Sequence, residues 1–184
     1  MELDGAYDTA IAIIGRACRI PGANEIHDVW PTIVSGTRSI RDFTISEAEK
    51  AGLSRADGES ADWVYAGAPI GGIECFDAAF FGYAPSDAAM MDPQHRLLLE
   101  HAWHAIEDAG YASDPMRGRI GVFAGSGPPA YKSHNLLTNA EKLAEAGELA
   151  ISIGNDKDAL CSTLSYKLGL EGPSVAVQTF CSTS

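Results

Sequence analysis

One segment of this 184-residue chain carries both a start and a stop signal for a helix. Asp92 can cap a helix, Pro93 suits the first helical position, and Gly110 is a natural stop. Between these signals, small or apolar residues recur at helical spacing: Leu98, Ala102, Ala105, Ile106 and Ala109. The sequence therefore predicts an amphipathic helix over residues 92–109.

Segments typical of strands alternate with other predicted helices. Residues 10–14 form an apolar run ended by Gly15, which is typical of a buried strand. Two later runs, 119–124 and 174–179, also predict strands. Further helices are expected within residues 24–35, near 46–51, over 135–146, and from a cap at Asn155 to a stop at Gly169. This alternation predicts the α/β class.

Charge and hydropathy exclude several classes of function. The formal net charge is −12, whereas nucleic-acid binding needs Lys and Arg to neutralise phosphates, so we expect neither a nucleic-acid nor a membrane-surface partner. No apolar run approaches the roughly 20 residues that span a bilayer. The acidic N-terminus lacks a signal-peptide pattern, so we expect a cytoplasmic protein.

The four cysteines are widely spaced and contain no Cys-x-x-Cys pair, which argues against zinc and thioredoxin-like sites. We interpret Cys18, Cys75 and Cys161 as small buried hydrophobic residues. Cys181 differs because it follows the predicted strand 174–179, where a helix could begin. Unpaired N–H groups and the positive end of a helix dipole favour the reactive thiolate there. Cys181 is therefore the candidate nucleophile.

Three histidines lie on the predicted helix 92–109, and two of them, His101 and His104, share a face. The order Glu100-His101-x-x-His104 is not the His-Glu-x-x-His arrangement of zinc proteases. We therefore interpret these two residues and His95 as surface or interface histidines, and we predict no metal site.

Two other polar segments are also interpreted as structural. Residues 125–127 could suggest a phosphate cradle, but the Gly-x-Gly-x-x-Gly and Walker patterns are absent, and Pro128 and Pro129 remove N–H donors. A plain loop is expected. Helix capping and dipole matching explain a polar cluster better than calcium does; its members are Asn155, Asp156 and Asp158.

Residues 177–184, Val-Gln-Thr-Phe-Cys-Ser-Thr-Ser, resemble the nucleophile segment of β-ketoacyl synthases. The resemblance is strongest to the ketosynthase domains of modular type I polyketide synthases. Further segments match the family in order: 11–22, 76–82, 91–100, and 154–158 with 165–174. The resemblance covers nearly the whole chain.

This resemblance implies a thiolase-like α/β fold, layered with helices on both sides of a mixed sheet. Residues 1–184 would be the N-terminal part of a single domain that ends just after the nucleophile. It also implies an acyltransferase. Cys181 would take an acyl chain, and a malonyl-type extender on acyl carrier protein would then decarboxylate and attack the acyl-cysteine. Substrates would arrive on phosphopantetheine, with no cofactor bound directly. The expected partners are acyl carrier protein and other domains of a polyketide synthase.

The resemblance also leaves questions open. The family's two catalytic histidines belong to the second half of the domain, so the alternative is a non-catalytic truncated fragment that serves dimerisation or carrier-protein docking. The family usually has a small residue where Phe180 stands, so this ring either narrows the acyl tunnel or packs in the core. In the family, the strand before the nucleophile pairs across a two-fold axis. We therefore expect a homodimer through the edge strand 174–179.

Overall fold

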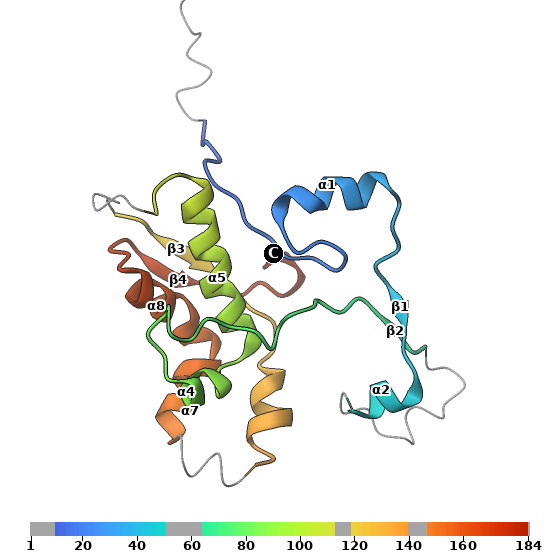
Figure 1. Cartoon of the computed structure of the whole chain (residues 1–184). Coiled ribbons are helices and arrows are strands. Elements are labelled where there is room, and N and C mark those ends of the chain that lie inside the picture. The colour runs from blue at the N-terminus through green and yellow to red at the C-terminus, as the bar shows by residue number, and fades with distance from the viewer. Residues whose placement is uncertain (1–9, 51–63, 113–118, 140–146, 184) are drawn as a thin grey trace, which may run out of the picture.

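The computed structural model of the chain describes residues 10–50, 64–112, 119–139 and 147–183. Its helices are α1 (Ile26–Val34), α2 (Ile45–Lys50), α4 (Pro85–Ala89), α5 (Pro93–Asp108), α7 (Glu148–Asn155) and α8 (Lys157–Leu168). Its strands are β1 (Arg41–Asp42), β2 (Ala66–Gly67), β3 (Val122–Ala124) and β4 (Ser174–Ala176). Helices α5 and α8 gather with β3 and β4 into a body, while α1, β1, β2 and α2 lie to one side (Figure 1).

Strands β3 and β4 form a parallel pair at the centre of this body. The register places Phe123 opposite Val175, and the pairing continues where Val177 N donates to Ala124 O at 2.9 Å. Helix α8 packs against both strands. The Cys161 thiol on α8 donates to Val175 O at 3.2 Å and to Ala124 O at 3.5 Å. Because the strands are parallel, the segments that follow them leave from the same edge.

The hydrophobic core lies between α5, α8 and β3. It brings together buried side chains from these elements and from the segments before α5: Phe81, Met91, Leu99, Val122, Cys161, Leu164 and Leu168. Leu99 is near the middle of α5 and is 2% exposed. Burying such side chains is the main favourable contribution to folding, at roughly 1.5–3 kcal/mol each.

The predicted boundaries of the longest helix are confirmed. Asp92 caps α5, because its Oδ1 accepts from Gln94 N at 2.9 Å. Gly110 has φ +79°, a left-handed conformation that favours glycine at a helix end. Gly169, with φ +64°, ends α8 in the same way. These signals are local, so the chain's own residues are enough to produce them.

The expected cap at Asn155 is wrong. Asn155 is the last residue of α7, and Asp156, in an extended conformation, separates α7 from α8. The Asn155 side chain is 2% exposed, and its Nδ2 donates to Met90 O and to Ile151 O, both at 2.8 Å. It therefore ties the α7–α8 junction to the α4–α5 junction. Sequence spacing alone does not indicate this long-range role.

The expected buried strand over residues 10–14 is also wrong. Ile11 is 94% exposed, Ile13 is 81% exposed, and no strand is assigned to this segment. A strand needs a neighbour for its N–H and C=O groups, and the described residues offer none there. Gly15, just after the run, packs so closely on α5 that a Cβ would overlap Ala105 O.

The sheets are small. The described residues form two separate two-stranded sheets, the antiparallel β1–β2 and the parallel β3–β4. The layered mixed sheet therefore stays a prediction for the whole domain. The helix expected over 135–146 lies partly outside the described residues, and a π-helical turn occupies Lys132–Leu136.

The three cysteines interpreted as buried differ in their exposure. Cys161 is buried as expected, but Cys75 is exposed; it ends a surface turn, in which its N–H donates to Gly72 O at 3.1 Å. Cys18 is half-buried.

His95 is not a surface histidine. It is 3% exposed because it lies one helical turn before Leu99, on the core-facing side of α5. Both ring nitrogens lack a hydrogen-bond partner among the described residues. Burial lowers the pKa of His95, and the nearby carboxylates of Asp92 and Asp156 offset this only in part. The ring is therefore held neutral. His101 is half-buried and His104 is exposed.

His95 should make the stability of the protein depend on pH. Its pKa is lower in the folded state than the ordinary value of 6.5, so the unfolded chain takes up the proton first as the pH falls. The contribution of neutral His95 to the free energy of unfolding should be fully present at pH values above 6.5. The free energy of unfolding should therefore decline between pH 7 and 5, by at most about 1.4 kcal/mol per pH unit. His95→Gln should flatten this decline in urea unfolding of the full-length protein, whereas His104→Gln should not. Equal slopes in the two variants would contradict the assignment.

Candidate active site around Cys181

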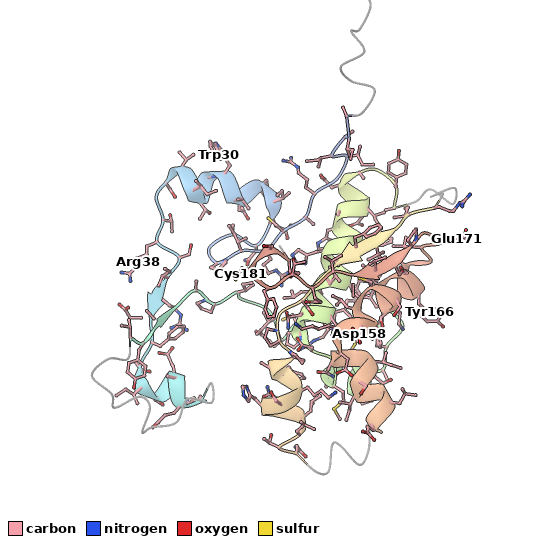
Figure 2. The ribbon with its side chains drawn as sticks, turned by 180° about the vertical axis from the view of Figure 1, so that it is seen from behind. Trp30, Arg38, Asp158, Tyr166, Glu171 and Cys181 are labelled. Atoms are coloured by element: carbon pink, nitrogen blue, oxygen red, sulfur yellow. The ribbon has the colours of Figure 1, made fainter. Side chains whose placement is uncertain are left out.

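Strand β4 ends at Ala176, earlier than the predicted 174–179, and Cys181 follows it after four intervening residues. A single 3-10 turn, Phe180–Ser182, carries it, and its side chain is exposed. Thr183 closes this turn: its Oγ1 accepts from Thr179 N at 2.8 Å, and its N–H donates to Phe180 O at 3.0 Å. Figure 2 shows Cys181 between the body and the lobe that carries Trp30 and Arg38. We name residues 179–183 the Cys181 turn.

A loop at residues 125–128, here named the glycine loop, lies against the Cys181 turn. It follows β3 and so leaves the sheet at the same edge as the end of β4. A Cβ added at Gly125 would overlap Thr183 Cγ2 and Val177 O. Only glycine allows the two segments to approach this closely.

Gln178, the residue directly before the Cys181 turn, contacts the glycine loop through its side-chain amide. In one amide orientation its nitrogen donates to Ser126 O at 3.0 Å and its oxygen accepts from Ser126 N at 3.2 Å. In the opposite orientation the side-chain oxygen accepts from Lys157 Nζ at 3.4 Å. The first orientation satisfies both groups of the amide and is the better assignment.

Gln94, in the first turn of α5, holds the glycine loop from the other side. Its Oε1 accepts from Gly127 N at 2.7 Å, and its Nε2 donates to Pro128 O at 3.4 Å. The sequence predicts a plain loop at residues 125–127 and indicates no role for Gln94 or Gln178. The closely spaced glycines and the two glutamines can be read in the sequence, but no local pattern indicates that they contact one another.

Phe180 adopts an unusual conformation beside the candidate nucleophile. Its φ is +54°, in the left-handed region that residues other than glycine avoid. Its side chain is 98% exposed, so the expectation that the ring packs in the core is wrong within the described residues. The turn that presents Cys181 is therefore a strained one.

Asp156 belongs to an ion pair. Lys132 Nζ lies 2.8 Å from Asp156 Oδ1, and this contact lowers the pKa of the carboxyl. Asp156 makes no side-chain capping bond to α8. Among the described residues, no group of three His, Cys, Asp or Glu side chains could hold a metal ion, and no helix is long and apolar enough to cross a membrane.

The chain matches a family of known proteins along almost its whole length. Residues 8–184 match the β-ketoacyl synthase N-terminal domain. A component of the phenolphthiocerol/phthiocerol polyketide synthase of Mycobacterium tuberculosis is 43% identical over 187 residues, which cover 96% of this chain and 12% of that protein. A pikromycin polyketide synthase component of Streptomyces venezuelae is 40% identical over 185 residues, which cover 98% of this chain and 5% of that protein.

A solved structure shares the fold. Ketosynthase twelve of the bacillaene polyketide synthase from Bacillus amyloliquefaciens superposes with a TM-score of 0.74 at 34% identity, over 91% of this chain and 29% of that one. The chain thus belongs to the β-ketoacyl synthase family and is the N-terminal part of a ketosynthase domain of the modular type I polyketide synthase kind. It spans only a small part of the length of these relatives.

The close packing at Gly125 predicts a test of the site's architecture. Gly125→Ala should force the glycine loop and the Cys181 turn apart, at a cost of about 1–3 kcal/mol, typical of overpacking. Gly71→Ala is the matched control, because a Cβ there meets nothing within 4 Å. Denaturant unfolding of the full-length protein measures both. If the two variants were equally stable, the described contact would be wrong.

Proposed function

We propose that Cys181 is the nucleophile of a ketosynthase that elongates an acyl chain. One observation carries this proposal: an exposed thiol, within the segment that resembles the family's nucleophile segment, is presented on a fixed turn at the common edge of two parallel strands. A strained, well-held turn of this kind is typical of active sites. The membership of the chain in the family supports the same assignment.

The proposed chemistry has two stages. The Cys181 thiolate attacks the carbonyl carbon of an acyl thioester, and the carrier thiol leaves as the acyl-cysteine forms. A malonyl-type thioester on acyl carrier protein then loses carbon dioxide, and the resulting enolate carbon attacks the acyl-cysteine. The new carbon–carbon bond forms as the Cys181 thiolate is released. The backbone N–H of Cys181 would contribute to the oxyanion hole at both carbonyl centres.

Other groups must complete this site. Decarboxylation and condensation need acid/base groups, which the family resemblance places beyond Ser184. We propose that residues 1–184 form the first part of one ketosynthase domain, and that its substrates arrive on the phosphopantetheine arm of acyl carrier protein. This chemistry requires no cofactor bound directly by the chain.

Acylation at Cys181 is the direct test. We expect the full-length protein, incubated with an acyl thioester of a carrier protein, to carry the adduct on the peptide that contains Cys181, as mapped by mass spectrometry. Cys181→Ala should abolish the adduct. Cys75→Ala is the matched control, because Cys75 is also an exposed thiol and lies outside the site. An adduct on Cys75 or Cys161, with Cys181 unmodified, would refute the proposal.

We also propose that the protein is a homodimer through β4. Along one of its long sides β4 pairs with β3, and within the described residues no strand pairs with its other long side, which we call the open edge. Val177 N donates toward β3, and successive N–H groups alternate along a strand, so Ala176 N points to the open edge. An open edge is a template for pairing with a second copy.

The open edge gives a specific variant. Ala176→Pro removes the N–H that faces the second copy, so it should shift the full-length protein from dimer to monomer at micromolar concentration in light scattering. Ala176→Val, which keeps the N–H, is the control. An unsubstituted protein that is monomeric at this concentration and still acylates Cys181 would show that the proposed homodimer is wrong.

A further inference from the structure

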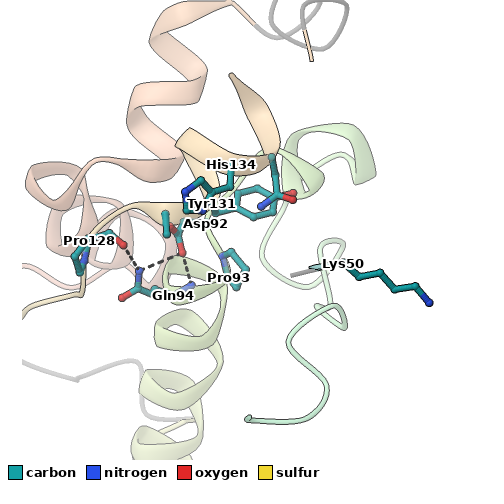
Figure 3. Close-up of a pocket in the computed structure, with 9 residues that line it drawn as sticks. Lys50, Asp92, Pro93, Gln94, Pro128, Tyr131 and His134 are labelled. Atoms are coloured by element: carbon teal, nitrogen blue, oxygen red, sulfur yellow. Dashed lines mark hydrogen bonds between the residues drawn. The ribbon is translucent and has the colours of Figure 1, made fainter. Parts of the chain in front are cut away.

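Gln94 contacts the glycine loop with both ends of its side-chain amide. The oxygen accepts from Gly127 N at 2.7 Å, and the nitrogen donates to Pro128 O at 3.4 Å. The same nitrogen lies 3.4 Å from Asp92 Oδ1, the atom that caps α5 (Figure 3). The amide is thus held between the start of α5 and the loop.

The base of this contact is rigid. Asp92 is 3% exposed, and its N–H donates to Gly154 O at 2.9 Å, which fixes the start of α5 against the end of α7. Gln94 therefore projects from an anchored helix end. A side chain on such an element can hold a loop in one position more accurately than another loop can.

The loop has few anchors of its own. Pro128 and Pro129 have no N–H to donate. Gly127 has no side chain, and a Cβ there would lie 3.1 Å from Gln94 Oε1, so a side chain at this position would push the amide back by a few tenths of an ångström. Apart from the local bond from Ala130 N to Pro128 O and the pairing of Ser126 with Gln178, the polar contacts of the loop with other described residues come from Gln94.

The far side of the loop touches the Cys181 turn and the two residues that precede it. Gly125 packs against Thr183 of the turn and against Val177, and Ser126 pairs with the amide of Gln178. A displacement of the glycine loop must therefore displace the turn. We propose that Gln94 is a positioning residue for Cys181 that acts through the glycine loop; this inference rests on the proposed function of Cys181.

Hydrogen exchange of the full-length protein tests the coupling without any acyl chemistry. Gln94→Ala should speed exchange severalfold in peptides that cover the glycine loop and residues 177–183, and leave α8 unchanged. Lys132→Gln is the matched control: it breaks the ion pair with Asp156, which does not involve the glycine loop. Unchanged exchange in residues 177–183 of a folded Gln94→Ala protein would overturn the proposal.

Acylation kinetics provide the functional readout. Misplacing a nucleophile by a fraction of an ångström slows its reaction, so Gln94→Ala should reduce the rate of Cys181 acylation about tenfold. Lys132→Gln should leave the rate unchanged. If the unsubstituted protein does not acylate Cys181, the proposed function fails, while hydrogen exchange still decides whether Gln94 holds the turn.

Gln94→Glu provides a signature that a general loss of stability would not produce. Its carboxylate still accepts from Gly127 N but cannot donate to Pro128 O until it is protonated. The negative charge of Asp92 should raise the pKa of this carboxyl above its usual value of about 4.3. The acylation rate relative to the unsubstituted protein should therefore rise as the pH falls from 7 to 5, whereas the ratio for Gln94→Ala should stay flat.

The native titratable groups around Gln94 are present in all of these proteins, and the Gln94→Ala ratio, which lacks the introduced carboxylate, measures what they contribute. They line the cavities on its two sides: Lys50, Asp92, Tyr131, His134, Arg19 and His101. If Gln94→Ala does not fold, Gln94→Glu decides the question alone, and a flat ratio in that variant would refute the proposal.

Discussion

The parallel pairing of β3 with β4 is the constraint on which the candidate site depends. Parallel strands end at the same edge, so the glycine loop and the Cys181 turn, which are about 50 residues apart in the sequence, are brought into contact. The pair is short. Helix α8 packs against it and stabilises it through the buried thiol of Cys161, which donates to a carbonyl of each strand. A shift of one strand would separate the two segments.

Neutral groups hold the site at this edge. Two glutamine amides, Gln94 and Gln178, bind the backbone of the glycine loop, and glycine at position 125 permits the close approach. The chain as a whole has a formal charge of −12. A carboxylate in place of either amide would add to this negative charge and could not donate a hydrogen bond until it is protonated. An amide supplies a donor and an acceptor without adding charge.

Local signals in the sequence predicted much of the fold, and long-range contacts account for the rest. Asp92 and Gly169 were identified correctly because a cap or a stop depends on neighbouring residues only. The apolar run 10–14 was misassigned because a strand exists only with a partner, which sequence periodicity does not supply. The sequence predicts that Cys181 follows a strand, although the strand is shorter than expected and a 3-10 turn stands where a helix was expected, but the sequence does not link Gln94 to Cys181. That link crosses from α5 to the loop after β3, and no local pattern encodes it.

The strain at Phe180 fits this arrangement. A left-handed conformation costs a residue with a Cβ about 1–2 kcal/mol, and burial of the ring cannot offset this cost within the described residues because the side chain is 98% exposed. The contacts on either side maintain the conformation: Thr183 bonds to Thr179 and Phe180, and Gly125 packs against Thr183. Glycine at position 180 would relieve the strain, but it would also let the turn sample other conformations. A bulky residue forced into this geometry by its neighbours keeps the number of accessible conformations small, and the Cys181 thiol is fixed as a consequence.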